Sequence, residues 1–524
     1  MFRTCINIGL RQHAGIVQRS VSSLSKLVDL DVRHPHSRDR KTKVICTVGP
    51  ATWDASGISS LLDAGMNVMR LNFSHGSYED KAKAIATLRA ELDRNARSDV
   101  DFDDGSCEDL CAIAADTKGP EIRTGAVADG AKAVELVGGS TVEITTDPQF
   151  ATSCTASRLF LDYPDFANEV SEGQTVFVDD GLIELTVTGL HPGEGAVDAK
   201  VVNGGMLGSG KGINLPGASL SLPAVSERDA ADLAFAVEQD MDIVFGSFIR
   251  SAADIADIRT ALGPAGAHIM VMAKIENWEG VLNFDEILAA SDGIMVARGD
   301  LGIEVPASKV FLAQKSMLAK CVLAGKPAIV ATQMLESMVK NPRPTRAEVS
   351  DVGNAVVDGA DAVMLSGETA VGAYPQAAVQ IMGKVCQEAE AVIDHGELGA
   401  SIRGRHAAYE DVLVSVGDHH KDATRDAIAS AATDAAARIQ SPVIVVLSAS
   451  GGTARDVARF RPEVPIVAVT DDARVARQLN VSKGVFPVVV APAPLDAMRA
   501  SGVAFGKSLG LPSATTPTRR SASM

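Results

Sequence analysis

The sequence predicts an α/β protein: a (β/α)8 TIM barrel with an inserted small β-barrel lid and a C-terminal α/β domain. Three observations predict this fold. Eight short apolar runs recur along the chain, and most are followed by a helical pattern. The stretch between the third and fourth runs holds only short strands and glycine turns. A second alternation of strands and helices follows the eighth run.

The pattern changes at five points along the 524 residues, so several domains are expected at about 150 residues each. The expected segments are an N-terminal arm (1–40), a discontinuous barrel domain (41–120 and 222–395), a β-barrel lid (121–221), a C-terminal α/β domain (396–511) and a disordered tail (512–524). The tail is rich in Ser, Thr and Pro, which cannot bury enough apolar surface to form a core.

The barrel strands are expected where apolar runs show no polar alternation, because such strands are buried on both faces. The runs cover residues 43–48, 67–72, 110–115, 243–248, 269–275, 293–297, 328–331 and 362–365. Capping-box pairs mark helix starts between them, at Ser77 with Asp80, Ser251 with Asp254 and Thr345 with Glu348. An open doubly wound sheet also fits the alternation of strands and helices. The prediction of a closed barrel therefore depends on the number of predicted strands, which is eight.

The lid is predicted from five short strand-like runs separated by glycine turns. These runs cover 134–136, 141–145, 175–178, 182–187 and 196–201. Within the lid, Gly205 to Lys211 reads G-x-x-x-x-G-K, but Gly212 replaces the Ser or Thr of a P-loop and Pro216 follows too soon for a helix. The P-loop interpretation therefore fails, although a lysine on a glycine-rich loop could still meet a phosphate.

The C-terminal region alternates again between helix and strand. Helices are expected at 422–439, 453–460 and 472–480, and strands at 443–447, 466–469 and 485–490. A Ser/Gly/Thr loop (448–453) joins the first strand to the next helix, which makes it a natural phosphate site. The polar stretch 397–421, with the pair His419-His420, is expected to be a loop rather than a metal site.

Composition limits the classes of partner. Hydrophobic residues make up 46% of the chain, enough for large cores, and no apolar run reaches the roughly 18 residues of a membrane span. The net charge of −17 argues against nucleic acid and against an anionic membrane. A phosphorylated substrate stays compatible, since a local basic cluster with a metal can overcome a distant negative field.

Two features bear on localisation. The seven cysteines are scattered without zinc-site spacing, which is typical of a reduced, intracellular protein and predicts the cytoplasm. The first 28 residues carry Arg3, Arg11, Arg19 and Lys26 but no acid, and four serines fall between 20 and 25. That composition also fits a mitochondrial or plastid transit peptide, and an ordinary basic arm is the third interpretation.

Polar side chains follow six of the eight predicted strands. They are Arg70, Asn72 and Ser74; Asp116 and Thr117; Lys274 and Glu276; Arg298 and Asp300; Thr332; and Ser366 and Glu368. A surface ion pair would explain any one set. Because the carboxyl ends of barrel strands meet at one rim, where barrel enzymes carry their catalytic residues, six sets together favour an active site. Two carboxylates, Glu276 and Asp300, would suit Mg²⁺ there.

Long motifs in these same segments resemble those of the pyruvate kinase family, over roughly residues 41–510. The motifs are MNVMRLNFSHG (66–76), DTKGPEIRTG (116–125), NLPG with LPAVSERD (214–229), MAKIEN (272–277), MVARGDLGIEVP (295–306), ATQMLESM (331–338), RPTRAEVSDVGNAVVDGADAVMLSGETA (343–370) and SASGGTARDVARFRP (448–462). Several long motifs in one order make the resemblance specific.

The resemblance implies an enzyme of glycolysis that transfers the phosphoryl group of phosphoenolpyruvate to ADP, giving pyruvate and ATP. The backbone N–H groups of Gly299 and Asp300 and the Thr332 hydroxyl would bind the phosphoenolpyruvate carboxylate. Arg70 would hold the phosphate, and Lys274 would stabilise charge on the transferring group and on the enolate. Dense positive charge is expected because phosphoryl transfer depends on positioning and electrostatics.

The resemblance also implies two cations and a nucleotide site. The implied ligands are Glu276 and Asp300 for Mg²⁺; Asn72, Ser74, Asp116 and Thr117 for K⁺; and Asn72, His75, Arg123 and Lys211 for ADP and ATP. Glu121 stands where K⁺-independent relatives carry lysine, so dependence on K⁺ is predicted. For His75 a packing role is an equal alternative. The family often has two adjacent lysines where this chain has Gly210-Lys211, which points to a lower nucleotide affinity.

The resemblance further implies a homotetramer and a sugar-phosphate effector. Ser448, Ser450 and Thr453 would hold an effector phosphate. After Leu511 the family normally continues into two more strands and a glycine-rich loop, and here the sequence turns into the Ser/Thr/Pro-rich tail. The sequence therefore leaves two questions open: whether the protein responds to fructose 1,6-bisphosphate, and whether its C-terminal domain supports a tetramer.

Two other functions compete with a pyruvate kinase activity. A metal-dependent aldolase acting on pyruvate would use the same kind of barrel, but it would not explain the lid or the Arg70, Asn72 and Ser74 set. A catalytically weak regulatory subunit would fit the altered C-terminal sequence, but the intact Lys274 and Glu276 argue against it.

Overall fold

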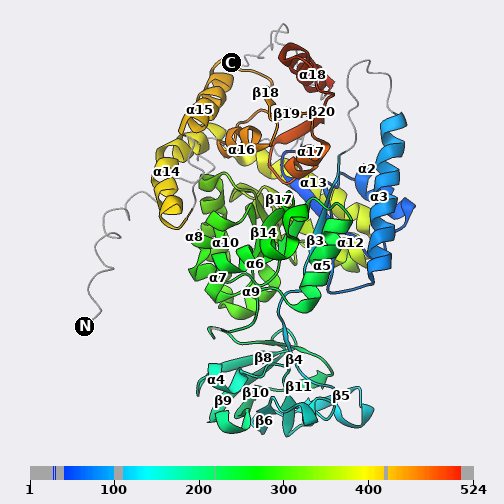
Figure 1. Ribbon diagram of the computed structural model, residues 1–524, viewed down its shortest axis with the longest axis vertical. Coiled ribbons are helices and arrows are strands. Elements are labelled where there is room, and N and C mark those ends of the chain that lie inside the picture. Colours follow the sequence, from blue (N-terminus) through cyan, green and yellow to red (C-terminus); the bar gives the residue numbers. More distant parts are fainter. Residues whose placement is uncertain are drawn as a thin grey trace, which may run out of the picture.

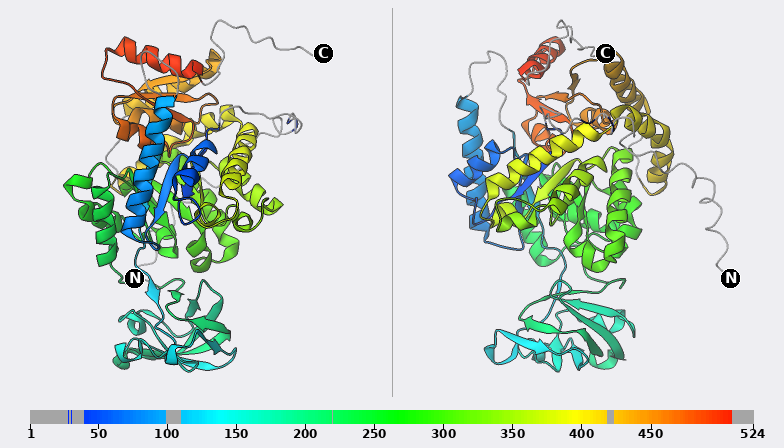
Figure 2. Two further views of the ribbon diagram at one scale, coloured as in Figure 1. Left: turned by 90° about the vertical axis from the view of Figure 1, so that its right-hand side faces the viewer. Right: turned by 180° about the vertical axis from the view of Figure 1, so that it is seen from behind.

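The computed structural model describes residues 28, 30, 40–98, 110–218, 220–417 and 423–508. Three parts follow one another along the long axis, with the lid at one end, the barrel in the middle and the C-terminal domain at the other end (Figure 1, Figure 2). The predicted transit peptide, the His419-His420 pair and the tail 512–524 lie outside the described residues. No helix in the described ranges is long and apolar enough to cross a membrane.

The middle part is a closed parallel barrel, which confirms the predicted fold class over the open sheet. Its strands are β1 (Lys43–Thr47), β2 (Val68–Asn72), β3 (Ala112–Asp116), β13 (Ile243–Gly246), β14 (Met270–Ile275), β15 (Gly293–Ala297), β16 (Ala328–Ala331) and β17 (Ala362–Leu365). Each pairs with its neighbours in the order β1-β17-β16-β15-β14-β13-β3-β2, and β1 closes on β2.

The strands lack polar alternation because both of their faces are buried. Residues such as Ile45, Phe245 and Met272 point inward and fill the barrel interior. Their neighbours along each strand, such as Val44 and Val271, pack against the surrounding helices. Burial on both sides explains why the strands were recognisable as continuous apolar runs.

Helices surround the barrel, and three of them begin directly after the capping residues predicted from the sequence, Ser77, Ser251 and Thr345. They are α2 (Ala55–Asp63), α3 (Tyr78–Ser98), α5 (Glu227–Glu238), α6 (Ala252–Leu262), α7 (Trp278–Leu282), α8 (Phe284–Ala290), α9 (Arg298–Glu304), α10 (Ala307–Ala324), α11 (Arg346–Val357), α12 (Gly367–Ala370) and α13 (Pro375–Val392). The predicted capping boxes at Ser251 and Thr345 both form, so each of these helices begins where its reciprocal hydrogen bonds satisfy the first backbone N–H groups.

The lid interrupts the barrel between β3 and β13. Its strands are β4 (Ile122–Arg123), β5 (Ala133–Leu136), β6 (Thr141–Thr145), β7 (Arg158–Phe160), β8 (Thr175–Val178), β9 (Ile183–His191), β10 (Ala196–Asn203), β11 (Gly205–Gly208) and β12 (Gly212–Asn214). Seven of them form one curled sheet in the order β4-β12-β8-β9-β10-β6-β7, and a bridge from Thr124 to Leu161 brings its two edges together. The G-x-x-x-x-G-K segment runs into β12 rather than into a helix, so it is no P-loop.

The C-terminal domain contains a three-stranded parallel sheet, β18 (Ile444–Leu447), β19 (Ile466–Thr470) and β20 (Val485–Val489). Helices α15 (Ala423–Arg438), α16 (Gly452–Arg459) and α17 (Ala473–Leu479) occupy the predicted positions. A further helix, α18 (Leu495–Ser508), follows β20 where no element was predicted, and it packs against β18 and β19.

The expectation of a loop at 397–421 was wrong, because most of this stretch forms helix α14 (His395–Ser415). Its apolar residues are few but share one face, at Leu398, Ile402, Tyr409 and Leu413. That face packs against α10 and α8, so tertiary contacts rather than local hydrophobicity stabilise the helix.

The C-terminal domain docks on the barrel face that carries the amino ends of the strands. Arg461 makes a two-bond ion pair with Asp361, at 2.7 and 2.8 Å, just before β17. Arg477 likewise bonds Asp242 at 2.8 Å before β13. At the start of β1, the Lys43 ammonium donates to the Val485 carbonyl at 2.6 Å. The lid and the C-terminal domain therefore cover opposite ends of the barrel.

Lys43 yields a prediction about stability and pH. Its ammonium is buried, and burial together with the nearby Arg40 cation lowers its pKa from 10.5 to about 7, although Glu390 opposes the shift. Between about pH 7 and pH 10 the unfolded chain holds a proton that the folded chain has released, so this group makes stability rise with pH. Lys43→Met should remove that slope. The quantity to compare is the unfolding free energy of Lys43→Met minus that of the unsubstituted protein. This difference should be higher at pH 6 than at pH 10, by on the order of a few kcal/mol.

Urea unfolding midpoints, measured across this pH range, test the prediction. Lys315→Met serves as the control, because Lys315 lies in an exposed ion pair with Asp358 and its removal should shift all midpoints alike. If the midpoints of Lys43→Met and of the unsubstituted protein change with pH in parallel, the expected lowering of the Lys43 pKa by burial is wrong.

Candidate active site

The carboxyl ends of the barrel strands form the rim that faces the lid, since the chain enters the lid directly after β3 (Figure 1). The strand register sets the polar residues side by side there. Asn72 of β2 lies opposite Asp116 of β3, and the Lys274 side chain of β14 reaches the same Asp116 carboxylate. Between rim and lid lies a cleft of about 290 Å³, lined by residues of both parts, among them Arg123, Lys211 and Asp300.

The centre of the rim is an ion network around the buried Asp116 carboxylate. Arg70 donates through Nε to Asp116 Oδ2 at 2.6 Å, and Lys274 donates through Nζ to Asp116 Oδ1 at 3.0 Å. Arg70 also donates through Nη1 to the Thr47 hydroxyl at 2.8 Å. One carboxylate thus holds two cationic side chains from different strands in fixed positions.

A second carboxylate completes this network. Glu276 Oε1 lies 3.0 Å from Lys274 Nζ, and Glu276 Oε2 accepts from the Phe248 backbone N–H at 2.7 Å. The Ser247 hydroxyl accepts from Lys274 at 2.7 Å and donates to the Thr117 carbonyl at 2.6 Å. Lys274 is therefore held from three sides, and its ammonium cannot turn away from the rim without losing these bonds.

The charges of the network follow from burial and mutual attraction. Burial alone would lower the pKa of Lys274, but the Asp116 and Glu276 carboxylates outweigh burial and raise the pKa above its ordinary value. Burial would likewise raise the pKa of Asp116, but Arg70 and Lys274 hold that pKa below its ordinary value. Lys274 thus stays a cation and Asp116 an anion at neutral pH.

The other two rim carboxyls behave differently and fit a divalent cation. Burial raises the pKa of Glu276 to about 7, with Asp300 adding to the effect and Lys274 opposing it. Burial also raises the pKa of Asp300, and the lid acids Asp180 and Glu121 add to it. Crowded, buried carboxylates short of positive charge are the oxygen donors that Mg²⁺ binds, so these residues fit the predicted site.

The four residues predicted for K⁺ also lie together at the ends of β2 and β3. Asn72 Oδ1 accepts from the Ser74 backbone N–H at 2.9 Å, which turns the chain after β2. The Thr117 hydroxyl accepts from the Ser247 N–H at 3.1 Å and lies beside Asp116. Their donor atoms are neutral oxygens plus one carboxylate, a set suited to a monovalent cation.

Thr332 occupies a strained turn next to Gly299. Its φ is +73° and that of Gln333 is +55°, values that a β-branched residue rarely adopts. A Cβ on Gly299 would lie 3.0 Å from Thr332 Cγ2, so the close approach requires glycine at 299. Gly299 and Asp300 lie in the first turn of α9, where backbone N–H groups lack helical partners.

Arg298 holds this turn in place. It forms a two-bond ion pair with Asp351 at 2.7 and 2.6 Å and donates to the Thr332 carbonyl at 2.9 Å and the Ala331 carbonyl at 3.2 Å. Its position between β15 and β16 explains how the Thr332 strain is maintained.

The lid residues predicted for the nucleotide lie at the cleft but are engaged with acids. Arg123 bonds Glu121 and donates to the Gly210 carbonyl at 2.8 Å, while Lys211 pairs with Asp179 at 2.9 Å. His75 is exposed at the rim, where its carbonyl accepts from Lys81 at 2.6 Å. Because His75 is exposed, the structure does not support the alternative that its ring has a packing role.

The predicted effector residues lie far from the rim, in the C-terminal domain. Ser448 directly follows β18, with its hydroxyl buried and without a hydrogen-bond partner in the described part of the chain. Ser450 is exposed on the loop that leads into α16, and Thr453 is exposed in the first turn of that helix. These three residues form a group of their own beside the C-terminal sheet.

Sequence reasoning placed Arg298 at the rim without a specific role, and it did not single out Ser247 or Asp351. Ser247 directly follows the apolar run of β13, the same strand-end signal that marked Lys274, so it could have been included. Asp351 lies inside helix α11, far from any strand end, and only the fold brings it to Arg298.

Comparisons with known proteins agree with this geometry. The family model "Pyruvate kinase, barrel domain" matches residues 39–379, and "Pyruvate kinase, alpha/beta domain" matches residues 426–515. The chain is 48% identical over 472 residues to a human pyruvate kinase, PKLR, covering 90% of this chain and 79% of the relative. It is 43% identical over 499 residues to a Leishmania mexicana pyruvate kinase, covering 94% of each, and 46% identical over 458 residues to that of Schizosaccharomyces pombe, covering 87% and 85%.

The Arg298 contacts yield a prediction. Arg298→Lys should loosen the Thr332 turn, because an ammonium cannot replace the planar fork that bonds Asp351 and two carbonyls at once. Amide hydrogen exchange at residues 331–335 should accelerate by about tenfold or more, equivalent to about one lost hydrogen bond. Arg438→Lys, in the exposed pair with Asp434, is the control. Unchanged amide exchange at residues 331–335 would show that the turn keeps its conformation without the Arg298 contacts.

Proposed function

The chain belongs to the pyruvate kinase family, and from that premise we propose how its residues carry out the family's reaction. A pyruvate kinase transfers the phosphoryl group of phosphoenolpyruvate to ADP and yields pyruvate and ATP, a step of glycolysis. The observation that carries the proposal is the buried network of Arg70, Asp116, Lys274 and Glu276 at the rim under the lid.

Phosphoenolpyruvate would bind with its carboxylate at the start of α9. The Gly299 and Asp300 N–H groups supply hydrogen bonds, and the Thr332 hydroxyl donates another from across the narrow gap at Gly299. Arg70 receives the phosphate, its guanidinium already oriented by Asp116 and Thr47. Because these groups are held in advance, little reorganisation accompanies the reaction.

Lys274 would act on the charge that develops during transfer. Its ammonium stays protonated between Asp116 and Glu276 and stabilises the transferring phosphoryl and the enolate oxygen left behind. The preorganised cation works in a site from which water is largely excluded, where electrostatic stabilisation is strongest. Phosphoryl transfer requires little covalent chemistry from the protein, so positioning and charge suffice.

Two cations would complete the site. Glu276 and Asp300 would hold Mg²⁺, which as a bound Lewis acid would neutralise charge on the phosphoryl and enolpyruvate oxygens. Asn72, Ser74, Asp116 and Thr117 would hold K⁺. The raised pKa values of Glu276 and Asp300 support the divalent site, since these buried carboxylates lack sufficient neighbouring positive charge.

ADP would bind between the rim and the lid. Arg123 and Lys211 would approach its phosphates, and Asn72 and His75 would contact it from the barrel. The cleft of about 290 Å³ supports this arrangement. Both lid cations would have to exchange their present partners, Glu121 and Asp179, for phosphate oxygens, which couples nucleotide binding to movement of the lid.

Regulation and assembly form a further part of the proposal. A sugar-phosphate effector would bind at Ser448, Ser450 and Thr453, for which the unpartnered, buried Ser448 hydroxyl is the support. A homotetramer would cover apolar side chains that the single chain exposes, such as Phe311 on α10, which is 56% exposed. Sedimentation as a monomer at micromolar concentration would refute the tetramer.

Lys274→Met tests the proposed active site. The rate of ADP-dependent pyruvate release should fall by at least about 10²–10³-fold, because a cation aimed at developing charge is removed, and KM should change less than kcat. Lys315→Met on the outer surface of α10 is the matched control and should keep full activity. An unsubstituted protein without activity in Mg²⁺ and K⁺, or a fully active Lys274→Met, would overturn the proposal.

Dependence on K⁺ is a separate prediction. At constant ionic strength the rate should rise steeply as K⁺ increases from zero to about 100 mM, since K⁺ bound by the oxygens of Asn72, Ser74, Asp116 and Thr117 would add a positive charge to the phosphate site. Glu121→Lys should flatten this response by placing an ammonium beside Lys118 and Arg123. A flat K⁺ response of the unsubstituted protein would rule out the monovalent site.

A further inference from the structure

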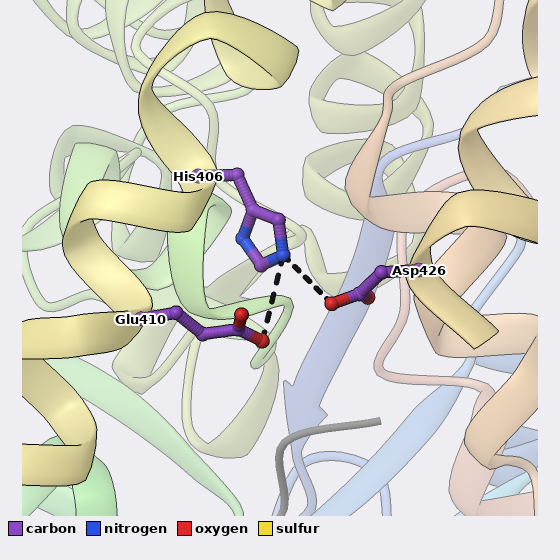
Figure 3. Close-up of side chains that lie close together, drawn as sticks. All are labelled: His406, Glu410 and Asp426. Atoms are coloured by element: carbon purple, nitrogen blue, oxygen red, sulfur yellow. Dashed lines mark hydrogen bonds and ion pairs between the residues drawn. The ribbon is translucent and has the colours of Figure 1, made fainter. Parts of the chain in front are cut away.

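A second cluster of metal-ligating side chains lies away from the rim, where α14 meets the C-terminal domain. His406 and Glu410 stand one turn apart on α14, and Asp426 faces them from α15 (Figure 3). His406 Nε2 lies 2.9 Å from Asp426 Oδ2 and 3.5 Å from Glu410 Oε1. All three side chains are largely buried, so water compensates little of their charge.

The proton on the imidazole can be assigned from its other contact. His406 Nδ1 lies 2.9 Å from the Leu323 carbonyl oxygen near the end of α10. A carbonyl oxygen only accepts, so Nδ1 carries a hydrogen and donates it. In the neutral ring, Nε2 then directs a lone pair at two carboxylates. Histidine ligands of metals commonly have this arrangement, with one nitrogen bonded to a carbonyl and the other to the metal.

Arg459 lies beside this cluster but does not fill it. Its Nη1 lies 2.7 Å from Nε2 and at the same time 3.3 Å from Nδ1. An atom placed along the outward lone pair of Nε2 would be much farther from Nδ1, so the guanidinium lies against the side of the ring. Arg459 Nη1 also donates to Asp426 Oδ1 at 2.7 Å. The other carboxylate oxygen, Oδ2, is the one that faces His406 Nε2.

The spacing of the donor atoms matches a small transition-metal ion. Tetrahedral zinc with bonds of about 2.0–2.1 Å has ligand atoms roughly 3.3 Å apart, and the two distances from Nε2 bracket that value.

We propose that His406, Glu410 and Asp426 form a binding site for a divalent transition-metal ion, with Zn²⁺ as the best match. An imidazole nitrogen with two carboxylates selects such an ion over Mg²⁺, which prefers oxygen donors. Glu410 and Asp426 also line a cavity of about 410 Å³ between barrel and C-terminal domain, which leaves room for water as a fourth ligand.

The position of the site gives the metal a structural consequence. α14 links the barrel to the C-terminal domain, α15 belongs to that domain, and the supporting Leu323 carbonyl belongs to α10 of the barrel. A bound ion would therefore join three segments at the junction of the two domains. The cavity beside it reaches Met270 and Asp292, at the amino ends of β14 and β15, whereas Lys274 lies near the other end of β14.

Metal titration of the full-length protein, stripped with a chelator and kept in saturating Mg²⁺ to occupy the rim, tests the site. One equivalent of Zn²⁺ should bind and raise the thermal midpoint, and Co²⁺ at the same site should give visible bands of a four-coordinate ion. His406→Gln should abolish the Co²⁺ bands. Glu410→Gln should weaken Zn²⁺ binding by about 10- to 100-fold or more, the range found even for groups that only support ligands.

His191→Gln is the matched control. His191 pairs with Asp198 at 3.0 Å on the lid, and among the described residues no third His, Cys, Asp or Glu completes a metal-binding group there, so its loss should leave Zn²⁺ and Co²⁺ binding unchanged. Equal binding by the unsubstituted protein and both cluster variants would overturn the proposal, as would the absence of binding in the unsubstituted protein. If His406→Gln does not fold, Glu410→Gln decides, since its longer side chain is the most exposed of the three.

Discussion

The buried carboxylate of Asp116 is the constraint on which the rim depends. It holds Arg70 and Lys274, which come from strands far apart in the chain, and each cation keeps the carboxylate ionised in return. Removing one member of such a buried network leaves another charge without compensation, which is strongly destabilising. The network therefore has to form completely, and it does so once β2, β3, β13 and β14 pair side by side and bring their carboxyl ends together.

Strain at the rim is maintained in a similar way. Thr332 and Gln333 adopt left-handed backbone angles that cost free energy, and the Arg298 ion pair with Asp351 holds the carbonyls that define this turn. Glycine at 299 then permits the Thr332 side chain to approach the first turn of α9. Rigid strands thus position the charges, while a strained turn between β16 and α11 positions a hydroxyl.

The two ends of the barrel have different roles: one carries the candidate active site and the other binds the C-terminal domain. The carboxyl ends carry the ion network and face the lid, whose cations Arg123 and Lys211 are paired with the acids Glu121 and Asp179. The amino ends carry Lys43, Asp242 and Asp361, which bond the C-terminal domain. Charged groups at both ends are buried. At the amino ends they meet oppositely charged or carbonyl partners within the chain, whereas at the rim burial and neighbouring acids raise the pKa of Glu276 and of Asp300 although Lys274 opposes the shift.

The sequence by itself determined the barrel, the lid, the C-terminal sheet and most rim residues, because strands buried on both faces are continuous apolar runs and the residue after each run must lie at the rim. It did not show α14, whose apolar face is sparse and is stabilised by packing on α10 and α8. Only the tertiary structure decided that Asp351 supports Arg298 and that His406, Glu410 and Asp426 meet, because these contacts join helices whose relative positions no local pattern encodes.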